Sequence, residues 1–209
     1  MPLYKTITVN TTTKVYLWKV TETEEELCSN VLLTNACKDR VSHMKSELHR
    51  RGFLSIRHLL KEAGYSPSDL YYDEFGKPHL KDEKYISITH SFIFTGIIVS
   101  DVPVGIDIEK QRDKILSISH KFTTYRSYRS TPNMNMVITK LTIIWCAKEA
   151  IYKLYAQPGL SFLDHIDIQD FEIDNVQTTG DVIFKQKVSG YAINFFEFEG
   201  FACAYALPK

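Results

Sequence analysis

The sequence carries no excess of charge of either sign. Its 209 residues include 25 Lys and Arg residues and 25 Asp and Glu residues, so the formal net charge at pH 7 is zero. Proteins that bind nucleic acid or an acidic membrane surface usually present a broad basic field. The balance therefore predicts neither partner, and the 44% hydrophobic content is ample for one large domain or two small ones.

The sequence has only four cysteines, and their spacing matches no paired motif. Cys28, Cys37, Cys146 and Cys203 form no C-x-x-C pair and show no zinc-ligand spacing with a histidine. Each lies in an apolar stretch, so we expect buried free thiols. This usage is typical of a reducing compartment.

Long apolar runs are missing as well. No stretch approaches the roughly 20 residues of a membrane-spanning helix. The sequence does not begin with the basic residues and following apolar run that would indicate a signal peptide. We therefore expect a cytoplasmic protein with no membrane partner.

Glycine-rich phosphate-binding loops are also absent, and one long stretch contains no acidic residue. Neither G-x-x-x-x-G-K-[ST] nor G-x-G-x-x-G occurs, so side chains and a metal, not a backbone loop, would hold any bound phosphate. No acidic residue occurs from Lys114 to Lys148, although Lys and Arg recur there. Such a basic stretch fits either an acidic partner or a solvated loop that acids elsewhere balance in space.

Strand and helix patterns occur in the same order twice. The first half predicts strands within 4–20, helices at about 21–33 and 42–63, and strands at about 85–91 and 94–101, and a strand at about 103–109 follows at the start of the second half. The second half predicts helices at 115–122 and 136–155 and strands at 166–173, 181–188, 191–198 and 201–207. We therefore predict an α+β fold of two similar halves, 1–101 and 102–209, related by a pseudo-twofold axis. Each half would pack helices on a small antiparallel sheet, with the active site at the seam.

The segment VGIDIEK, residues 104–110, alternates acids with isoleucines. In a strand, Asp107 and Glu109 would share one face, while Ile106 and Ile108 would take the other. Neighbouring carboxylates repel unless water or a shared cation separates them, and a hard cation such as Mg²⁺ prefers carboxylate oxygens. The alternative is an edge strand with one wet face.

The segment WCAKEAIYKL, residues 145–154, lies in the long predicted helix. Trp145, Glu149 and Lys153 are four residues apart and run along one side of it. A surface ion pair between Glu149 and Lys153 is the simplest interpretation. The tryptophan on that side, and Lys148 beside it, favour a magnesium–pyrophosphate site. There Glu149 would complete the metal shell or act as a base, and the lysines would neutralise phosphate oxygens.

Other cations occur in the first half. FGKP places Lys77 in a turn, ITHS places His90 near a strand end, and HRRGFLSIRHLL supplies Arg50, Arg51 and Arg57 from a helix. Singly these are ordinary features, since arginines commonly line the wet side of an amphipathic helix. As a set they could contact anions.

In this order, FGKP, ITHS, VGIDIEK and WCAKEAIYKL resemble the motifs of the 4′-phosphopantetheinyl transferases, specifically the larger two-half (surfactin-type) group. A G-[IV]-D-x-E strand, followed about forty residues later by W-x-x-K-E-x-x-x-K, is the signature of that family. The resemblance covers roughly residues 50–165 by motif, and the whole chain by length and layout.

The resemblance implies an enzyme that moves the phosphopantetheine arm of coenzyme A onto a serine of an apo acyl or peptidyl carrier protein, releasing 3′,5′-ADP. It implies that Asp107, Glu109 and Glu149 hold Mg²⁺, with Glu149 also acting as the base. Lys153 would stabilise the departing phosphate. Cations that would contact the phosphates of coenzyme A are Lys148 at the diphosphate, and Lys77, His90, Arg57 and Arg50.

The resemblance also gives the basic stretch a partner. Carrier proteins of this kind are acidic around the modified serine, so residues 114–148 become a candidate docking surface. Tyr125, Tyr128, Met134 and Met136 would add apolar contacts. A fused two-half chain has less need to dimerise, so we expect a monomer.

Two other functions fit parts of the pattern. A non-catalytic descendant would bind coenzyme A or a carrier protein without transfer, although a changed Glu149 or Lys153 would then be expected. A magnesium-dependent hydrolase of nucleotide pyrophosphates would need a residue to position water, and it has no use for the basic stretch.

Overall fold

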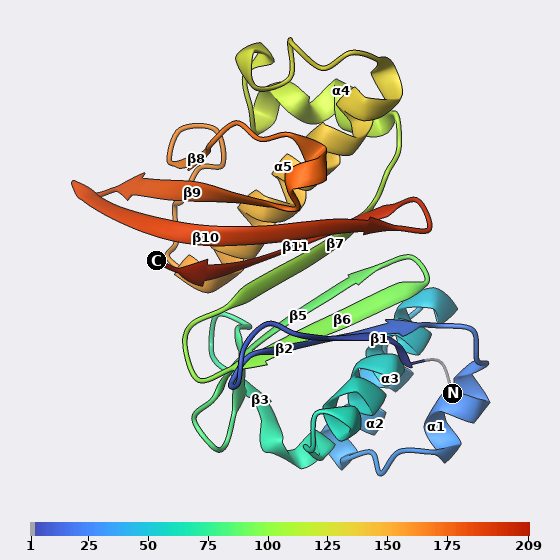
Figure 1. Ribbon diagram of the computed structural model, residues 1–209. Helices are drawn as coiled ribbons and strands as arrows, with labels where there is room; N and C mark the ends of the chain where they lie inside the picture. Colours follow the sequence, from blue (N-terminus) through green and yellow to red (C-terminus); the bar gives the residue numbers. More distant parts are fainter. Residues whose placement is uncertain (1–2) are drawn as a thin grey trace. The chain divides into compact units, whose positions relative to one another are not determined.

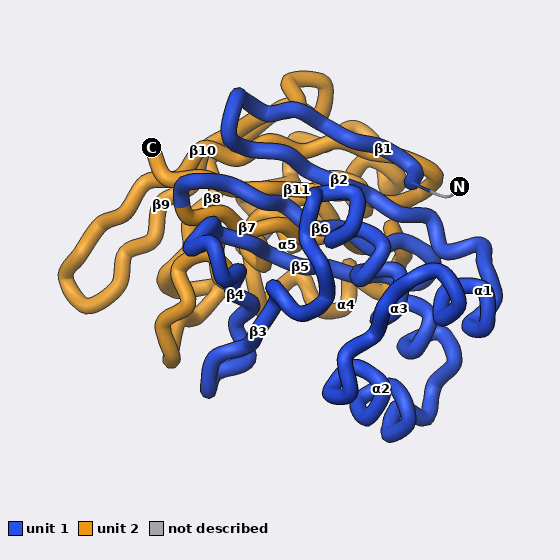
Figure 2. Tube along the Cα trace, turned by 90° about the horizontal axis from the view of Figure 1, so that it is seen from below, with its two compact units in different colours: residues 1–102 blue, residues 103–209 orange. Residues whose placement is uncertain are grey.

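The computed structural model describes residues 3–209, apart from the side chain of Tyr125. Residue contacts divide the chain into two compact units, unit 1 up to Val102 and unit 2 from Pro103 (Figure 2). Each unit packs helices on an antiparallel sheet, so the predicted α+β class is confirmed. The pseudo-twofold relation, the halves 1–101 and 102–209 as domains, and the seam site stay predictions.

Unit 1 is built on a four-stranded antiparallel sheet of order β1-β2-β6-β5 (Figure 1). Its strands are β1 (Leu3–Thr8), β2 (Lys14–Lys19), β5 (Tyr85–Ser91) and β6 (Phe94–Ser100), and a separate ribbon pairs β3 (Leu70–Tyr72) with β4 (Pro78–Leu80). Its helices are α1 (Glu24–Ser29), α2 (Asn35–Ser42) and α3 (Glu47–Glu62), with a 3₁₀ turn at Pro67–Asp69.

The helix α3 packs against β2 and β6. Ser46 caps its start by accepting a hydrogen bond from the His49 backbone N–H. A Cβ placed at Gly52 would lie 3.8 Å from Thr95 Cγ2 on β6, and the Ser55 and Thr95 hydroxyls are 2.8 Å apart. The face of α3 that carries the small residues Gly52 and Ser55 therefore lies close to β6, in the middle of the sheet.

Unit 2 is built on a five-stranded antiparallel sheet of order β7-β11-β10-β9-β8. Its strands are β7 (Gly105–Lys110), β8 (Ile166–Ile168), β9 (Gln177–Phe184), β10 (Lys187–Phe198) and β11 (Phe201–Pro208). Its helices are α4 (Lys114–Ile118) and α5 (Met134–Tyr155), with 3₁₀ turns at Ser119–Lys121, Tyr125–Ser127 and Ile173–Asn175. Among the residues that the structure describes, no helix combines the length and apolarity needed to cross a bilayer.

Small residues let α5 lie directly on β7 and β11 (Figure 1). Ala202, Ala204 and Ala206 of β11 are fully buried in the core that α5 covers. A Cβ at Gly105 of β7 would lie only 1.8 Å from the carbonyl oxygen of Ala150. No larger residue leaves room there for the helix backbone, so Gly105 sets how closely α5 approaches β7.

The two units share a connectivity. In unit 1, β2 pairs antiparallel with β6, the last strand, and α3 packs on both. In unit 2, β7 pairs antiparallel with β11, again the last strand, and α5 packs on both. This shared order explains why the same succession of patterns occurs twice in the sequence.

Candidate functional site

The strand β7 presents two carboxylates to the helix side of its sheet. Asp107 is paired with Ala204, and Glu109 with Ala202, across the β7–β11 ladder. Directly paired residues point to the same face of a sheet, and these alanines belong to the core beneath α5. The predicted shared face of Asp107 and Glu109 is therefore confirmed, and it faces α5.

Lys153 of α5 reaches this face of β7. Its Nζ donates to Asp107 Oδ1 at 2.7 Å and to the Ile106 carbonyl oxygen at 3.0 Å. Burial disfavours the Lys153 ammonium, but Asp107 outweighs it, with help from Glu149, and the pKa of Lys153 is raised. Asp107 is only 5% exposed, and a carboxylate so buried needs a cation close by. Lys153 supplies it.

Glu149 lies one helical turn before Lys153 and is half-buried. Burial raises the pKa of its carboxyl to about 7, and Asp107 and Glu109 add to the rise while Lys153 opposes it. The three carboxylates are therefore within electrostatic range of one another. A carboxyl with a pKa near neutrality suits proton transfer at physiological pH.

The donor set fits a hard divalent cation by its chemistry. Mg²⁺ takes carboxylate oxygens and waters, and a cation would relieve the repulsion that raises the pKa of Glu149. Within residues 3–209, however, no three His, Cys, Asp or Glu side chains are gathered as in an assembled metal site. Metal binding by Asp107, Glu109 and Glu149 stays a prediction, and their oxygens would have to turn toward a common point.

Lys148 is directed away from these acids. It is 4% exposed, and its Nζ donates to the carbonyl oxygens of Phe162 at 2.7 Å and Ile166 at 2.5 Å. Burial lowers the pKa of Lys148 to about 8, with Asp167 opposing the shift. The side chain ties α5 to the segment that follows it, and its contact with a diphosphate stays a prediction.

A pocket of about 90 Å³ lies over Lys148. Its lining residues are Thr123, Thr124, Ser127, Lys148, residues 163–167 and Ile183. Two of them, Asp164 and Asp167, are acidic, whereas Lys148 contributes the one lysine. That balance does not suit a diphosphate, so this pocket is not where we place coenzyme A phosphates.

The side chains of the two arginines predicted to bind coenzyme A contact other residues of unit 1. Arg57 is 4% exposed, its guanidinium lies 3.4 Å from the centroid of the Phe53 ring, and Nη1 donates to the Phe53 carbonyl oxygen. Arg50 donates through Nε to Glu24 at 2.8 Å and through Nη1 to the Met44 carbonyl oxygen. Both are engaged within unit 1, and their phosphate contacts stay predictions.

Lys77 lies in the turn between β3 and β4. Its backbone N–H donates to Asp73 Oδ1 at 2.8 Å, which fixes the turn. Its side chain is half-buried, and burial lowers the pKa of the ammonium while Asp73 opposes that change. The turn therefore holds Lys77 at a defined position, and its contact with coenzyme A stays a prediction.

His90, near the end of β5, is exposed and lies beside a second histidine. The centroids of the His49 and His90 rings are 6.1 Å apart, with the ring planes at 90°. The sequence pattern does not indicate this contact, because a histidine in the first turn of an amphipathic helix gives no signal of its own. Only the tertiary contact with His90 singles it out.

The basic stretch divides into two groups in the structure. Lys140 and Lys148 are buried, and Lys140 forms an ion pair of 2.6 Å with Asp170. The exposed members are Lys114, Lys121, Arg126 and Arg129. Of the predicted apolar contacts, Met134 and Met136 are exposed and Tyr128 is half-buried, while the side chain of Tyr125 lies outside the described part.

Comparison with known proteins identifies the family. Residues 103–206, nearly all of unit 2, match the family model described as the 4′-phosphopantetheinyl transferase superfamily, and the chain belongs to this superfamily. The predicted family is thus confirmed.

A curated relative supports the same assignment. The 4′-phosphopantetheinyl transferase gsp of Aneurinibacillus migulanus is 29% identical over 137 residues, which cover 63% of this chain and 55% of the relative. The chain therefore spans about half the length of the curated relative it matches.

Proposed function

We propose that this protein transfers the 4′-phosphopantetheine arm of coenzyme A to a serine hydroxyl of an apo acyl or peptidyl carrier protein, as a member of the larger surfactin-type group. One observation carries the proposal. The unit that matches the family holds Lys153 against Asp107 at 2.7 Å, beside a Glu149 carboxyl whose pKa is about 7.

The chemistry assigns a separate role to each of these side chains. Glu149 takes the proton from the carrier serine, whose oxygen attacks the β-phosphorus of coenzyme A. The bond from that phosphorus to the bridging oxygen breaks, and 3′,5′-ADP leaves with the α-phosphate. The Lys153 ammonium neutralises charge on the leaving phosphate.

Asp107, Glu109 and Glu149 would hold Mg²⁺, consistent with their carboxylate chemistry. When bound, Mg²⁺ supplies charge neutralisation at the pyrophosphate. Asp107 also orients Lys153 through its hydrogen bond. Asp107→Ala should therefore raise the Mg²⁺ concentration needed for half-maximal rate at least tenfold, measured by titrating Mg²⁺ in the transfer assay. An unchanged requirement would remove Asp107 from the metal ligands.

The partners follow from the same proposal. Lys77 and His90, which lie nearer the surface of unit 1, would bind coenzyme A phosphates. Carrier proteins would dock through the exposed cations Lys114, Lys121, Arg126 and Arg129. We expect the protein to act as a monomer in the cytoplasm, with no nucleic acid or membrane partner.

Intact-protein mass spectrometry tests the proposal. An apo acyl carrier protein is incubated with this protein, coenzyme A and Mg²⁺. A gain of one phosphopantetheine group is expected, lost on chelation of Mg²⁺ and with a carrier in which the serine is alanine. Release of 3′,5′-ADP despite the alanine carrier would instead indicate a hydrolase. Tight coenzyme A binding with no gain on any carrier would indicate a non-catalytic descendant.

A further inference from the structure

The thiol of Cys37 lies in the first turn of α2, close to α3. Its backbone N–H donates to the side chain of Thr34, the residue that caps α2. The two helices lie side by side in unit 1 (Figure 1, Figure 2), and Arg40 of α2 is over the Phe53 ring of α3 at 5.6 Å. The backbone N–H groups at the start of a helix favour a nearby negative charge, so this turn favours the thiolate form of Cys37.

Arg57 of α3 brings a buried cation to this thiol. Its side chain is only 4% exposed and acts on the Cys37 sulfur both as a positive charge and as a weak donor. Nη1 donates to the Phe53 carbonyl oxygen, but Nε is buried and makes no hydrogen bond to any of residues 3–209. A buried donor without an acceptor is costly. Because sulfur is a weak acceptor, an oxygen bonded to it would be a better partner for this guanidinium.

The surroundings of the two cysteines of unit 1 differ in charge. Burial disfavours the Cys37 thiolate, but hydrogen bonds from Thr34 and the charge of Arg57 outweigh it, and the pKa of Cys37 is lowered. Cys28 is half-buried, and burial together with Glu24 raises its pKa. The other two cysteines, both in unit 2, are 0% exposed, whereas Cys37 is 7% exposed. Cys37 therefore combines a cationic environment with some access to solvent.

Thiolate character and access together decide which cysteine is oxidised. We propose that Cys37 is an oxidation site, where hydrogen peroxide converts the thiolate to a sulfenic acid that Arg57 stabilises. The sulfur attacks one peroxide oxygen, so that an S–O bond forms and the O–O bond breaks. The sulfur is oxidised, the peroxide is reduced, and the hydroxide that leaves takes a proton and becomes water. The new oxygen accepts a hydrogen bond from the buried guanidinium.

Trapping with dimedone, a reagent for sulfenic acids, tests the inference on the full-length protein. The protein is treated with hydrogen peroxide in the presence of dimedone, and peptide mass spectrometry locates the label. Cys37 should be labelled about tenfold faster than Cys28, because it has more thiolate character. Cys37→Ser should abolish the fast label, and Cys28→Ser should retain it. Absence of label at Cys37, or equal rates at the two cysteines, would overturn the proposal.

Two substitutions of Thr34 separate the charge beside the thiol from the fold. Aspartate and asparagine both cap helices at least as well as threonine, so both variants should melt as the wild type does. Thr34→Asp places a negative charge next to Cys37 and should slow oxidation about tenfold, since a like charge disfavours the thiolate. Thr34→Asn, its neutral match, should be oxidised at the wild-type rate. Equal rates in the two variants would show that charge at this turn does not control the reaction.

Arg57 is tested by a second pair of variants. Arg57→Gln removes the cation and should slow the labelling of Cys37 about tenfold, whereas Arg57→Lys keeps a positive charge and should slow it less. Wild-type rates in Arg57→Gln would remove Arg57 from the site. Phosphopantetheine transfer is measured separately, because the proposed reaction does not use the Cys37 thiol. Failure of one proposal therefore leaves the other standing.

Discussion

Glu149 is a carboxyl group held where ionisation is unfavourable. Its pKa is about 7 in the folded protein against an ordinary value of 4.5, with burial as the first cause. Below pH 4.5 the group is protonated in both the folded and the unfolded chain. Between 4.5 and 7 the unfolded chain ionises first, so the metal-free protein loses stability as pH rises. Above pH 7 the carboxyl is ionised in both states, and the loss of stability is complete.

Glu149→Gln should therefore stabilise the metal-free protein while removing activity. In EDTA, its melting temperature should exceed that of the wild type at pH 8, with the difference shrinking toward pH 4.5. The transfer rate should fall by on the order of 10²–10⁴, the usual contribution of a general base. Thermal denaturation at both pH values and a rate assay check this. A lower melting temperature than wild type at pH 8 would contradict the pKa argument.

The rate of transfer should depend on the same carboxyl. Since a general base must be ionised, kcat/KM should rise with pH and level off at or below about pH 7, because a bound cation favours the carboxylate. Initial rates with saturating Mg²⁺ between pH 5.5 and 8 measure the profile. A profile that falls over this range would assign the proton transfer to another group.

Sequence patterns relate the acids to one another in space but do not show which way the cations point. Alternation along a strand is enough to place Asp107 and Glu109 on one face, and four-residue spacing relates Glu149 to Lys153. Arg57 and Lys148 were expected at phosphates, but both are buried and donate to carbonyl oxygens of their own unit. Long side chains can bend back onto the backbone, and a polar position in a pattern does not reveal the direction.

At the scale of elements, replacing each of two glycines by alanine should change the unfolding free energy in opposite directions. Gly105→Ala places a methyl group 1.8 Å from the Ala150 carbonyl oxygen, so α5 must move away from β7. We expect a loss of about 1–3 kcal/mol or more of unfolding free energy. The displacement also separates Lys153 from Asp107, so activity should fall with stability.

Gly52→Ala is the matched control. The new methyl group lies 3.8 Å from Thr95 Cγ2, an ordinary contact, and alanine favours a helix more than glycine does. We expect a gain of about 0.5–1 kcal/mol. Urea denaturation of both variants measures the difference. If both variants destabilise the protein alike, α3 packs more tightly on β6 than the Gly52–Thr95 distance indicates.

Element boundaries were less predictable than element types. The expected helix 42–63 begins at Glu47, because residues 35–42 form a separate helix that Thr34 caps. Strands were expected at 181–188 and 191–198, with a break at 189–190, but the chain turns at Lys185 and Gln186, both with positive φ. Gly190 instead continues β10, paired with Asp181 of β9. Pairing with a neighbouring strand decided this boundary, and a local pattern does not contain that information.

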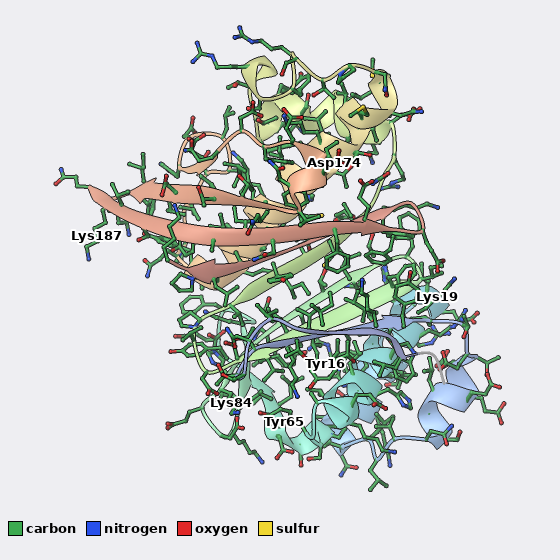
Figure 3. All side chains as sticks on the ribbon, in the orientation of Figure 1. Tyr16, Lys19, Tyr65, Lys84, Asp174 and Lys187 are labelled. Carbon is green, nitrogen blue, oxygen red and sulfur yellow. The ribbon has the colours of Figure 1, made fainter. Side chains whose placement is uncertain are left out.

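At the scale of the whole molecule, zero net charge conceals an uneven surface. Arg126 and Arg129 are exposed in a stretch without acids. Arg126→Glu/Arg129→Glu should weaken carrier binding about tenfold, chiefly through slower association, and leave coenzyme A binding unchanged. Lys185→Glu/Lys187→Glu, at the β9–β10 turn (Lys187 in Figure 3), is the charge-matched control.

Surface plasmon resonance at low and moderate salt distinguishes the two double variants. The arginine variant should lose both affinity and salt dependence, since screening acts on exposed charges. Equal losses in both variants would indicate a general charge effect and remove the docking role from residues 126–129.

The repeated order of strands and helices predicted two α+β units from sequence, since hydrophobic periodicity is local. The sequence does not show why α3 packs on β2 and β6 of unit 1, or why α5 packs on β7 and β11, the first and last strands of unit 2. In unit 2 that packing depends on Gly105 and on the alanines of β11, residues that attract no notice when a sequence is searched for acids and bases.

Ala202, Ala204 and Ala206 hold no reactive atom, yet they fix the height at which α5 lies above β7. Valine at any of them would push the helix away from the sheet. It would thereby separate Lys153 from the Asp107 carboxylate, although neither of these two residues had been substituted. Screens that rank positions by chemical reactivity would miss these three residues. For anyone redesigning this protein, the first property to conserve is the small size of the side chains beneath the helix, ahead of the identity of any charged group.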